Sequence, residues 1–264
     1  MIWKLLLTAI VITMFAGCAK MYEIQPSIQK LNDETKGRVV VTSYYVPQGS
    51  GEKLSLFVFG IPQNLEASIY DVTDGDVRYI GTLPIVYIHN GGYLIEYFPS
   101  IGKHVFMLTV PPFPTPLAWR HTDFIEVTVE KDKTTHLALP FSGFRKMPYF
   151  TPVDMPEEDF IGCSSIKGDY YQTRDGVNAY LASHNVPKEM EDFRHYCLKL
   201  AASSPIIATN DAVKKFNEGK EQVIQWYKED VKIWQEKHEN RPLFNLTHLY
   251  EKEEPTQANE SEAK

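Results

Sequence analysis

The side chains best suited to covalent chemistry in this chain are its three cysteines, Cys18, Cys163 and Cys197. A cysteine nucleophile needs a base within hydrogen-bond reach, and His195 lies two residues from Cys197. Residues two positions apart on a helix do not face each other, so this pair is not a ready dyad. Three alternatives stay open for Cys163 and Cys197: a disulfide, two buried thiols, or a catalytic thiol.

Metal and acid–base chemistry have weaker signals. The eight histidines fit no metal-binding spacing, and the chain has no Walker phosphate loop, no His-Glu-x-x-His, no Cys-x-x-Cys and no Gly-x-Ser-x-Gly. Two acidic groups could hold calcium, but a solvated face and a hairpin turn are the simpler interpretations. These groups are Asp154, Glu157, Glu158 and Asp159, and Asp71, Asp74 and Asp76 around Gly75. We therefore expect no enzyme activity, no cofactor and no metal.

The first 17 residues have the pattern of an export signal. Lys4 provides a positive charge, and the stretch 5–16 is apolar except for two threonines. A membrane-spanning helix needs ~20 apolar residues, whereas a shorter run is typical of a secretory signal.

The end of this run resembles a bacterial lipobox, with small residues at the two positions before a cysteine: Met14-Phe15-Ala16-Gly17-Cys18. Phe15 departs from the commoner leucine, and an ordinary signal peptide is the alternative. The resemblance implies that the Cys18 sulfur receives a diacylglycerol, that the chain is cut before it, and that the new amine is acylated (a palmitate-type anchor). Ala19 in place of aspartate implies sorting to the outer membrane, facing the periplasm. Because the periplasm is oxidising, we favour a disulfide between Cys163 and Cys197.

The composition indicates a folded, acidic protein. The net charge is −7 and 43% of the residues are hydrophobic. A packed core is therefore possible, and nucleic acid is not an expected partner.

The stretch 38–145 has the pattern of a β-sandwich. Short β-branched and aromatic segments recur, among them 38–46, 54–60, 67–73, 77–83, 85–89, 93–98, 103–110, 124–130 and 134–140. Turn signals at 74–76, 90–92 and 131–133 predict hairpins, and a proline-rich crossing covers 111–116.

Residues 69–110 resemble small β domains found in many bacterial lipoproteins. The resemblance is carried by IYDVTDGDVRYIGTL and GGYLIEYFPSIGKHVFML, in which Pro99 and Gly102-Lys103-His104 form the typical turn. It implies a β fold and an envelope setting, and no particular activity.

The remaining segments are a tether at 18–37, a strap followed by helices within 146–250, and an acidic tail at 251–264 that we expect to be disordered. Apolar residues at helical spacing predict one helix from Val186-Pro187 to about Leu200 and a second after Thr209. The second would be ~40 Å long, so one end could overhang and meet a partner. The fold class is thus α+β, an antiparallel β-sandwich followed by an α-helical region.

Aromatic side chains suggest an interaction surface. Most of the tyrosines on predicted strands should be core, whereas Tyr170, Tyr171, Trp226 and Trp234 could be exposed. We expect a lipid-anchored outer-membrane protein that acts as a structural or accessory subunit of an envelope assembly, with a protein partner. A module that binds envelope glycan or lipid is the alternative, and a hydrolase would require His, Asp and Ser or Cys side chains that converge in a cleft.

Overall fold

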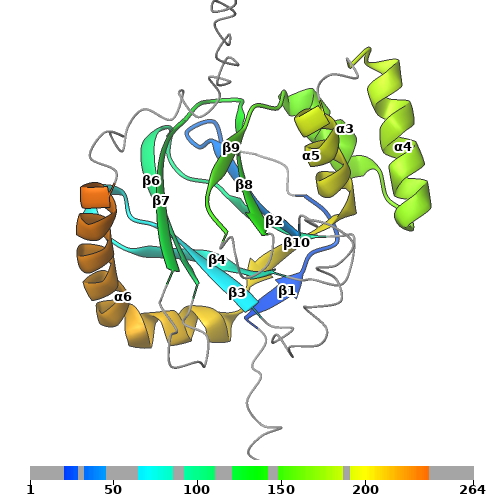
Figure 1. Ribbon diagram of the computed structural model, residues 1–264. Coiled ribbons are helices and arrows are strands. Elements are labelled where there is room, and N and C mark those ends of the chain that lie inside the picture. The colour runs from blue at the N-terminus through cyan, green and yellow to red at the C-terminus, as the bar shows by residue number, and fades with distance from the viewer. Residues whose placement is uncertain are drawn as a thin grey trace, which may run out of the picture.

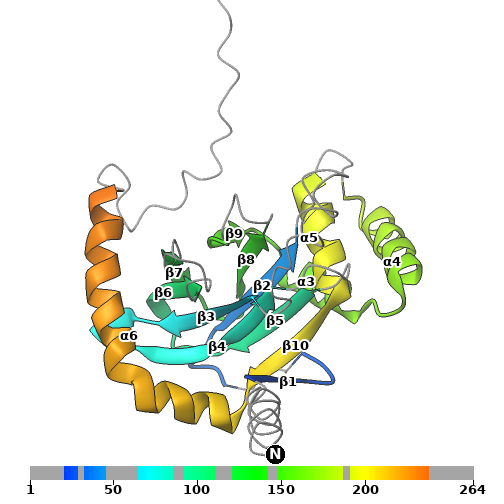
Figure 2. The same ribbon diagram turned by 60° about the horizontal axis from the view of Figure 1, so that its bottom comes forward.

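Two β-sheets packed face to face form the centre of the molecule, with helices on both outer sides (Figures 1 and 2). The computed structural model describes residues 21–28, 33–45, 65–85, 92–110, 121–141, 148–186 and 191–237, and every structural statement below concerns these. This arrangement confirms the predicted α+β fold with sandwich-like sheets. Several predicted segments lie outside the described residues: the signal 1–17 with Cys18, the strand 54–60, most of the strand 85–89, the crossing 111–116 and the tail 251–264.

The larger sheet has six described strands and a mixed pairing. Their order is β1 (Tyr22–Ile24), β10 (Ser203–Ala208), β5 (Gly92–Tyr97), β2 (Arg38–Tyr45), β8 (Thr134–Phe141) and β9 (Thr151–Val153). β10 runs parallel to β5 and β2 runs parallel to β8, while the other pairs are antiparallel. The sandwich is therefore not purely antiparallel.

The smaller sheet is antiparallel, in the order β4 (Arg78–Ile85), β3 (Leu65–Asp71), β6 (Gly102–Val110) and β7 (His121–Val129). The predicted turn at 74–76 joins β3 to β4 through a 3₁₀ turn, η1 (Thr73–Gly75). Asp74 and Gly75 both adopt positive φ, 61° and 78°, a conformation in which aspartate and glycine are common.

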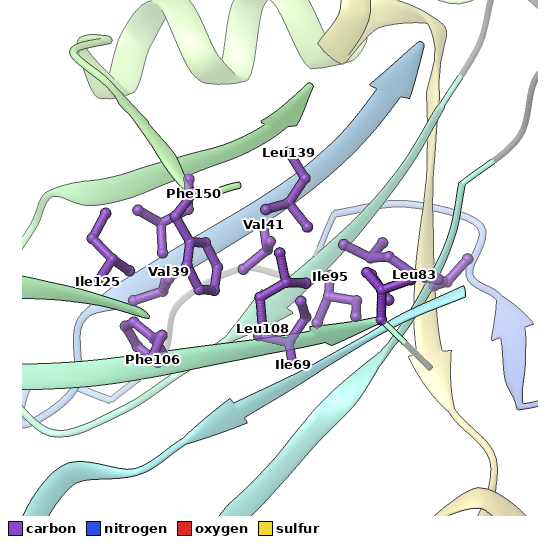
Figure 3. Close-up of a cluster of buried hydrophobic side chains, with 14 of the residues drawn as sticks. Val39, Val41, Ile69, Leu83, Ile95, Phe106, Leu108, Ile125, Leu139 and Phe150 are labelled. Carbon is purple, nitrogen blue, oxygen red and sulfur yellow. The ribbon is translucent and has the colours of Figure 1, made fainter. Parts of the chain in front are cut away.

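The core between the sheets follows from the two-residue period of the strands. Val39 and Val41 of β2 point inward and are fully buried, while Val40 points to the opposite face (Figure 3). They meet Ile69, Phe106 and other side chains of the smaller sheet. Each large aliphatic or aromatic side chain buried in this way contributes roughly 1.5–3 kcal/mol.

Helices cover the outer face of each sheet. On the larger sheet lie α3 (Glu157–Ser165) and α5 (Glu191–Ala202), with α4 (Tyr170–Ser183) outside them (Figure 1). On the smaller sheet lies α6 (Asn210–Lys237), which changes direction and wraps around the sheet in both views (Figures 1 and 2). The Thr209 hydroxyl accepts a hydrogen bond from the Ala212 amide at 3.1 Å and caps α6, as predicted.

Several predicted boundaries differ from the structure. The predicted tether contains β1, and the predicted strap and helical region contains β9 and β10, which complete the larger sheet. The strap itself is helical, since α3 and α4 occupy most of 157–183.

One predicted hairpin is also wrong. The strands before and after 131–133, β7 and β8, lie in different sheets, so the chain passes there from one sheet to the other. The predicted hairpin at 90–92 is not tested, because most of its first strand, 85–89, lies outside the described residues.

Candidate functional site

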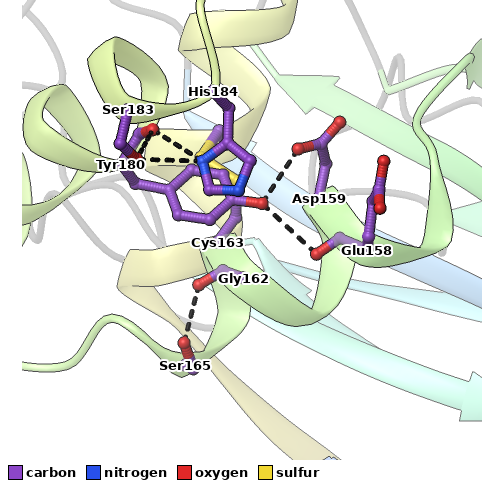
Figure 4. Close-up of a disulfide and its surroundings, with 9 residues drawn as sticks. Glu158, Asp159, Gly162, Cys163, Ser165, Tyr180, Ser183 and His184 are labelled. Carbon is purple, nitrogen blue, oxygen red and sulfur yellow. Dashed lines mark hydrogen bonds between the residues drawn. A yellow bond between two sulfur atoms is a disulfide. The ribbon is translucent and has the colours of Figure 1, made fainter.

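Cys163 of α3 and Cys197 of α5 are joined by a disulfide with a Cα–Cα distance of 5.3 Å (Figure 4). Both residues are fully buried against the larger sheet, beside Phe160 and Leu200. The pairing is the one that the sequence favours, and it leaves neither sulfur available as a nucleophile. His195 lies exposed on α5, two residues before Cys197.

The side chain of Tyr180 of α4 lies next to the segment of α3 that carries Cys163 (Figure 4). Its hydroxyl donates to the Asp159 carboxylate at 2.9 Å, and its ring stacks on His184 with centroids 4.1 Å apart. Partial burial and the bond to Asp159 raise the pKa of Tyr180 to about 12, so the phenol stays protonated at neutral pH. A Cβ on Gly162 would stand 2.3 Å from this ring, which explains why glycine precedes Cys163.

A buried ion cluster joins α3 to the outer face of the larger sheet. Arg38 of β2 lies 2.8 Å from Glu157 and 3.6 Å from Glu96, and its guanidinium lies 5.5 Å from the centre of the Phe160 ring. The Thr134 hydroxyl donates to the other oxygen of Glu157. The sequence placed Glu157 in a solvated acidic cluster, but the structure half-buries this residue as the partner of Arg38.

His136 of β8 lies beside this cluster. Its Nδ1 is 3.2 Å from the Tyr196 hydroxyl, and its ring meets Phe160 edge to face. Burial, assisted by the positive charge of Arg38, lowers the pKa of His136 to about 3. The imidazole is therefore neutral in the folded protein at neutral and mildly acidic pH.

This neutral histidine makes stability depend on pH. In the unfolded chain the pKa of His136 returns to about 6.5, so between pH 6.5 and 3 the unfolded state binds the extra proton. Stability is thus lost as the pH falls, by about 2 kcal/mol at pH 5 for this group. We expect His136→Gln to show a correspondingly smaller loss between pH 7 and pH 5 in urea unfolding. Parallel profiles for the two proteins would contradict this assignment.

Asp71, His104 and Ser100 converge at one end of the smaller sheet, the combination that a hydrolase would require. His104 Nδ1 lies 3.0 Å from Asp71 Oδ2, and Nε2 lies 3.5 Å from Ser100 Oγ. The carbonyl oxygen of Ser100 is closer to Nε2, at 2.9 Å. Nε2 therefore lies closer to the carbonyl oxygen, which can only accept a hydrogen bond, than to the Ser100 hydroxyl, so the three residues do not have the geometry of a serine nucleophile paired with its base.

The Asp71 carboxylate accepts further hydrogen bonds. Asp71 is 1% exposed and accepts bonds from the Tyr97 hydroxyl at 3.0 Å and the Thr73 amide at 3.0 Å. Burial by itself raises the pKa of Asp71, but the bonds from Thr73, Tyr97 and His104 outweigh it and lower the pKa. The group is a structural cross-link between the β3–β4 turn, β5 and β6. The sequence named Asp71 and His104 separately but could not show that they meet.

The three acids around Gly75 do not converge on one point. Asp71 is turned inward, whereas Asp76 pairs with Lys220 of α6 at 3.0 Å. Within the described ranges, no group of three or more His, Cys, Asp or Glu residues is arranged to hold a metal ion.

The four aromatic residues predicted to be exposed divide into two pairs. Tyr171 of α4 is 66% exposed, and the Arg174 guanidinium carbon lies 5.6 Å from the centre of the Tyr171 ring. The side chain of Tyr170 lies outside the described part of the structure. Trp226 and Trp234 instead pack against the outer face of the smaller sheet, and Trp234 Nε1 donates to Asp123 at 3.2 Å. Both tryptophans are partly buried there, because α6 turns its aromatic face toward the sheet. The described part of α6 is docked as far as Trp234 and does not overhang.

The first described residue, Met21, lies at the corner where β1, β10 and α6 meet. Its carbonyl accepts the Thr209 amide at 3.2 Å, and β1 is the edge strand of the larger sheet. If Cys18 carries a lipid, this corner is therefore the part of the fold nearest the anchor.

Among the described helices, none combines the length and the apolar character needed to cross a bilayer. Comparison with protein-family models and with curated proteins found no match to this chain.

Proposed function

We propose that this chain is a lipid-anchored outer-membrane protein that faces the periplasm and acts as an accessory interaction subunit of an envelope assembly. The anchor is Cys18, and the folded part is the sandwich with its helices. The partner is another protein of the envelope.

The observation that carries the proposal is the buried Cys163–Cys197 disulfide, in a chain whose first 17 residues have the pattern of an export signal. Structural disulfides persist in the periplasm and are rare in the reducing cytosol. The lipobox-like ending of the signal then supplies the anchor, since several acyl chains on one residue hold a protein stably on a membrane.

The interaction role is supported by how the polar groups are used. The buried charged clusters, Asp71 with His104 and Arg38 with Glu96 and Glu157, hold elements of the fold together. By contrast, α4 lies outermost on the helical side and exposes Tyr171 and Arg174. Tyrosine and arginine are enriched at the centres of protein interfaces, which makes this face of α4 the candidate contact with the partner.

The test is Cys18→Ser, compared with the unchanged chain in a bacterial host that processes lipoproteins. We expect the unchanged chain in the outer-membrane fraction and the variant out of it, because the variant cannot receive the diacylglycerol. Mass measurement of the N-terminal peptide checks the modification directly. Equal membrane fractionation of the two proteins would contradict the anchor.

The same pair of strains tests the interaction role. Mild crosslinking should recover an envelope protein with the anchored chain and less of it with Cys18→Ser. If the anchored chain instead retains only glycan or lipid, it is a ligand-binding module and the subunit role is wrong.

A further inference from the structure

We propose that the corner formed by Ile24, Ile207 and Val213 rests in the interface of the membrane that holds Cys18, so that the sandwich stands on its β1 edge. This inference rests on the lipid anchor proposed above and adds the surface through which the folded part contacts lipid. We call these three residues the apolar corner.

Backbone pairing brings the three residues to one place. Glu23, next to Ile24, pairs with Ile207 across β1 and β10, and the Thr209 amide donates to the Met21 carbonyl at 3.2 Å. Val213 lies one turn into α6, with its amide bonded to the Thr209 carbonyl at 3.0 Å. Both views show β1 beside the start of α6, and in Figure 2 this corner lies at the bottom of the molecule.

The side chains at this corner are exposed although they are apolar. The exposed fractions are 65% for Ile24, 47% for Ile207 and 41% for Val213. Ile24 is paired with the buried Ile206, so Ile24 and Ile207 lie on opposite faces of the sheet. A flat membrane surface can contact side chains on both faces of a sheet only if the sheet stands on its edge. The β1 edge would therefore be the part of the larger sheet that rests on the membrane.

Val213 shows the same exposure from the helical side. It belongs to the apolar stripe of α6, whose later members Phe216, Tyr227 and Trp234 pack on the smaller sheet. The stripe therefore continues one turn beyond the part that packs on the sheet. Ile24, Ile207 and Val213 are thus exposed apolar side chains along one edge of the fold, and exposed apolar surface of this kind marks contact sites with protein or membrane.

The short segment between Cys18 and β1 makes the membrane the expected partner of the apolar corner. Only three residues separate Cys18 from Tyr22. A fully extended chain covers at most ~3.6 Å per residue, so β1 stays within about 14 Å of the anchored cysteine. Held so close, even weak apolar contacts with the headgroup and acyl boundary are favourable, because the anchor makes the second contact intramolecular.

Charge does not select this corner. Lys214 and Lys215 follow Val213 in the chain and are exposed. Glu23 of β1 and Asp211 in the first turn of α6 are exposed as well. The corner thus has both signs of charge, and we expect its contact with lipid to depend on apolar burial rather than on anionic headgroups.

The experiment uses the full-length, lipidated protein in vesicles of phosphatidylethanolamine and phosphatidylglycerol that contain nitroxide-labelled lipid. Single variants Ile207→Cys and Val213→Cys receive a thiol-reactive fluorophore. The label reaches only the new cysteine, since the Cys18 sulfur carries the diacylglycerol in the lipidated protein and Cys163 is bonded to Cys197. The matched control is Ile233→Cys, because Ile233 is also an isoleucine, is also 47% exposed, and lies ~30 Å further along α6.

We expect the nitroxide lipids to quench the labels at 207 and 213, with no loss of fluorescence at 233. Equal quenching at all three positions, or none at 207 and 213, would overturn the apolar corner while Cys18 is still found acylated by mass. A Cys18 without lipid would overturn the anchor itself, and with it this inference. Circular dichroism of each labelled variant verifies that the fold is retained.

Discussion

Replacing Cys163 and Cys197 together by alanine is expected to lower the free energy of unfolding by about 4 kcal/mol. The two cysteines are 34 residues apart, and the bond limits the conformations of the loop between them in the unfolded chain. The bond also fixes α3 to α5 on the larger sheet, so its loss weakens the helical layer that holds α4. Urea unfolding followed by circular dichroism measures the change.

The single variants make this prediction sharper. If the bond forms, Cys163→Ala alone already removes it, and adding Cys197→Ala should cost little more. Two free thiols would instead give small losses that add. Dithiothreitol provides a second control, since the reduced protein should approach the double variant in stability. Additive single effects, or no response to reductant, would refute the disulfide.

Asp71→Ala is expected to destabilise the protein by at least ~3 kcal/mol. The carboxylate is buried and accepts bonds from the Thr73 amide, the Tyr97 hydroxyl and the His104 ring. Its removal leaves several buried donors without an acceptor, and each such group costs roughly 1–3 kcal/mol. Because the pKa of Asp71 is lowered in the folded state, the stability it provides is present above its unfolded pKa and is lost as the pH falls through its folded pKa.

The matched control is Asp76→Ala, on the other side of the same turn. Asp76 is half-exposed and pairs with Lys220 and Arg78 in solvent, where ion pairs contribute little. We expect a much smaller loss than for Asp71→Ala, measured in the same urea titrations. Similar losses for both variants would show that the turn, and not the buried carboxylate, determines the effect.

The same region shows how far the candidate sites could be predicted. The turn at 74–76 between β3 and β4 was predicted correctly from its Asp-Gly sequence. The reason is that the positive φ of Asp74 and Gly75 is a local property of the chain. Asp71 and His104 are 33 residues apart, and only the pairing of β3 with β6 brings them together. Their contact could not follow from the spacing of either residue.

Two helices, α3 and α4, carry local signals in their sequences. Asp169 and Gln172 form a capping box at the start of α4, with the Gln172 amide bonded to Asp169 at 2.9 Å. Acidic residues occupy the first turn of α3, where they complement the helix dipole. Both patterns were visible in a stretch interpreted as an extended strap, because its apolar residues show no clear period.

Strand partners are the feature that local patterns predicted least well. The segment Ser203–Ala208 follows a predicted helix and carries no predicted strand, yet it forms β10 between β1 and β5. At 131–133 the turn signal was real, but the chain uses it to cross between the sheets. A turn sequence specifies a change of direction and not which strand the chain pairs with next.

The sequence by itself determined the features that depend on neighbouring residues. These are the strand-rich region, the turn at 74–76 and the capped α6 with its apolar stripe. The tertiary structure alone decided the features that depend on residues distant in the chain. These are the Cys163–Cys197 bond among the alternatives, the Asp71–His104 contact, and the packing of Trp226 and Trp234 on the smaller sheet. The physical reason is that backbone conformation and periodicity are local, whereas burial and strand pairing arise only when the whole chain packs.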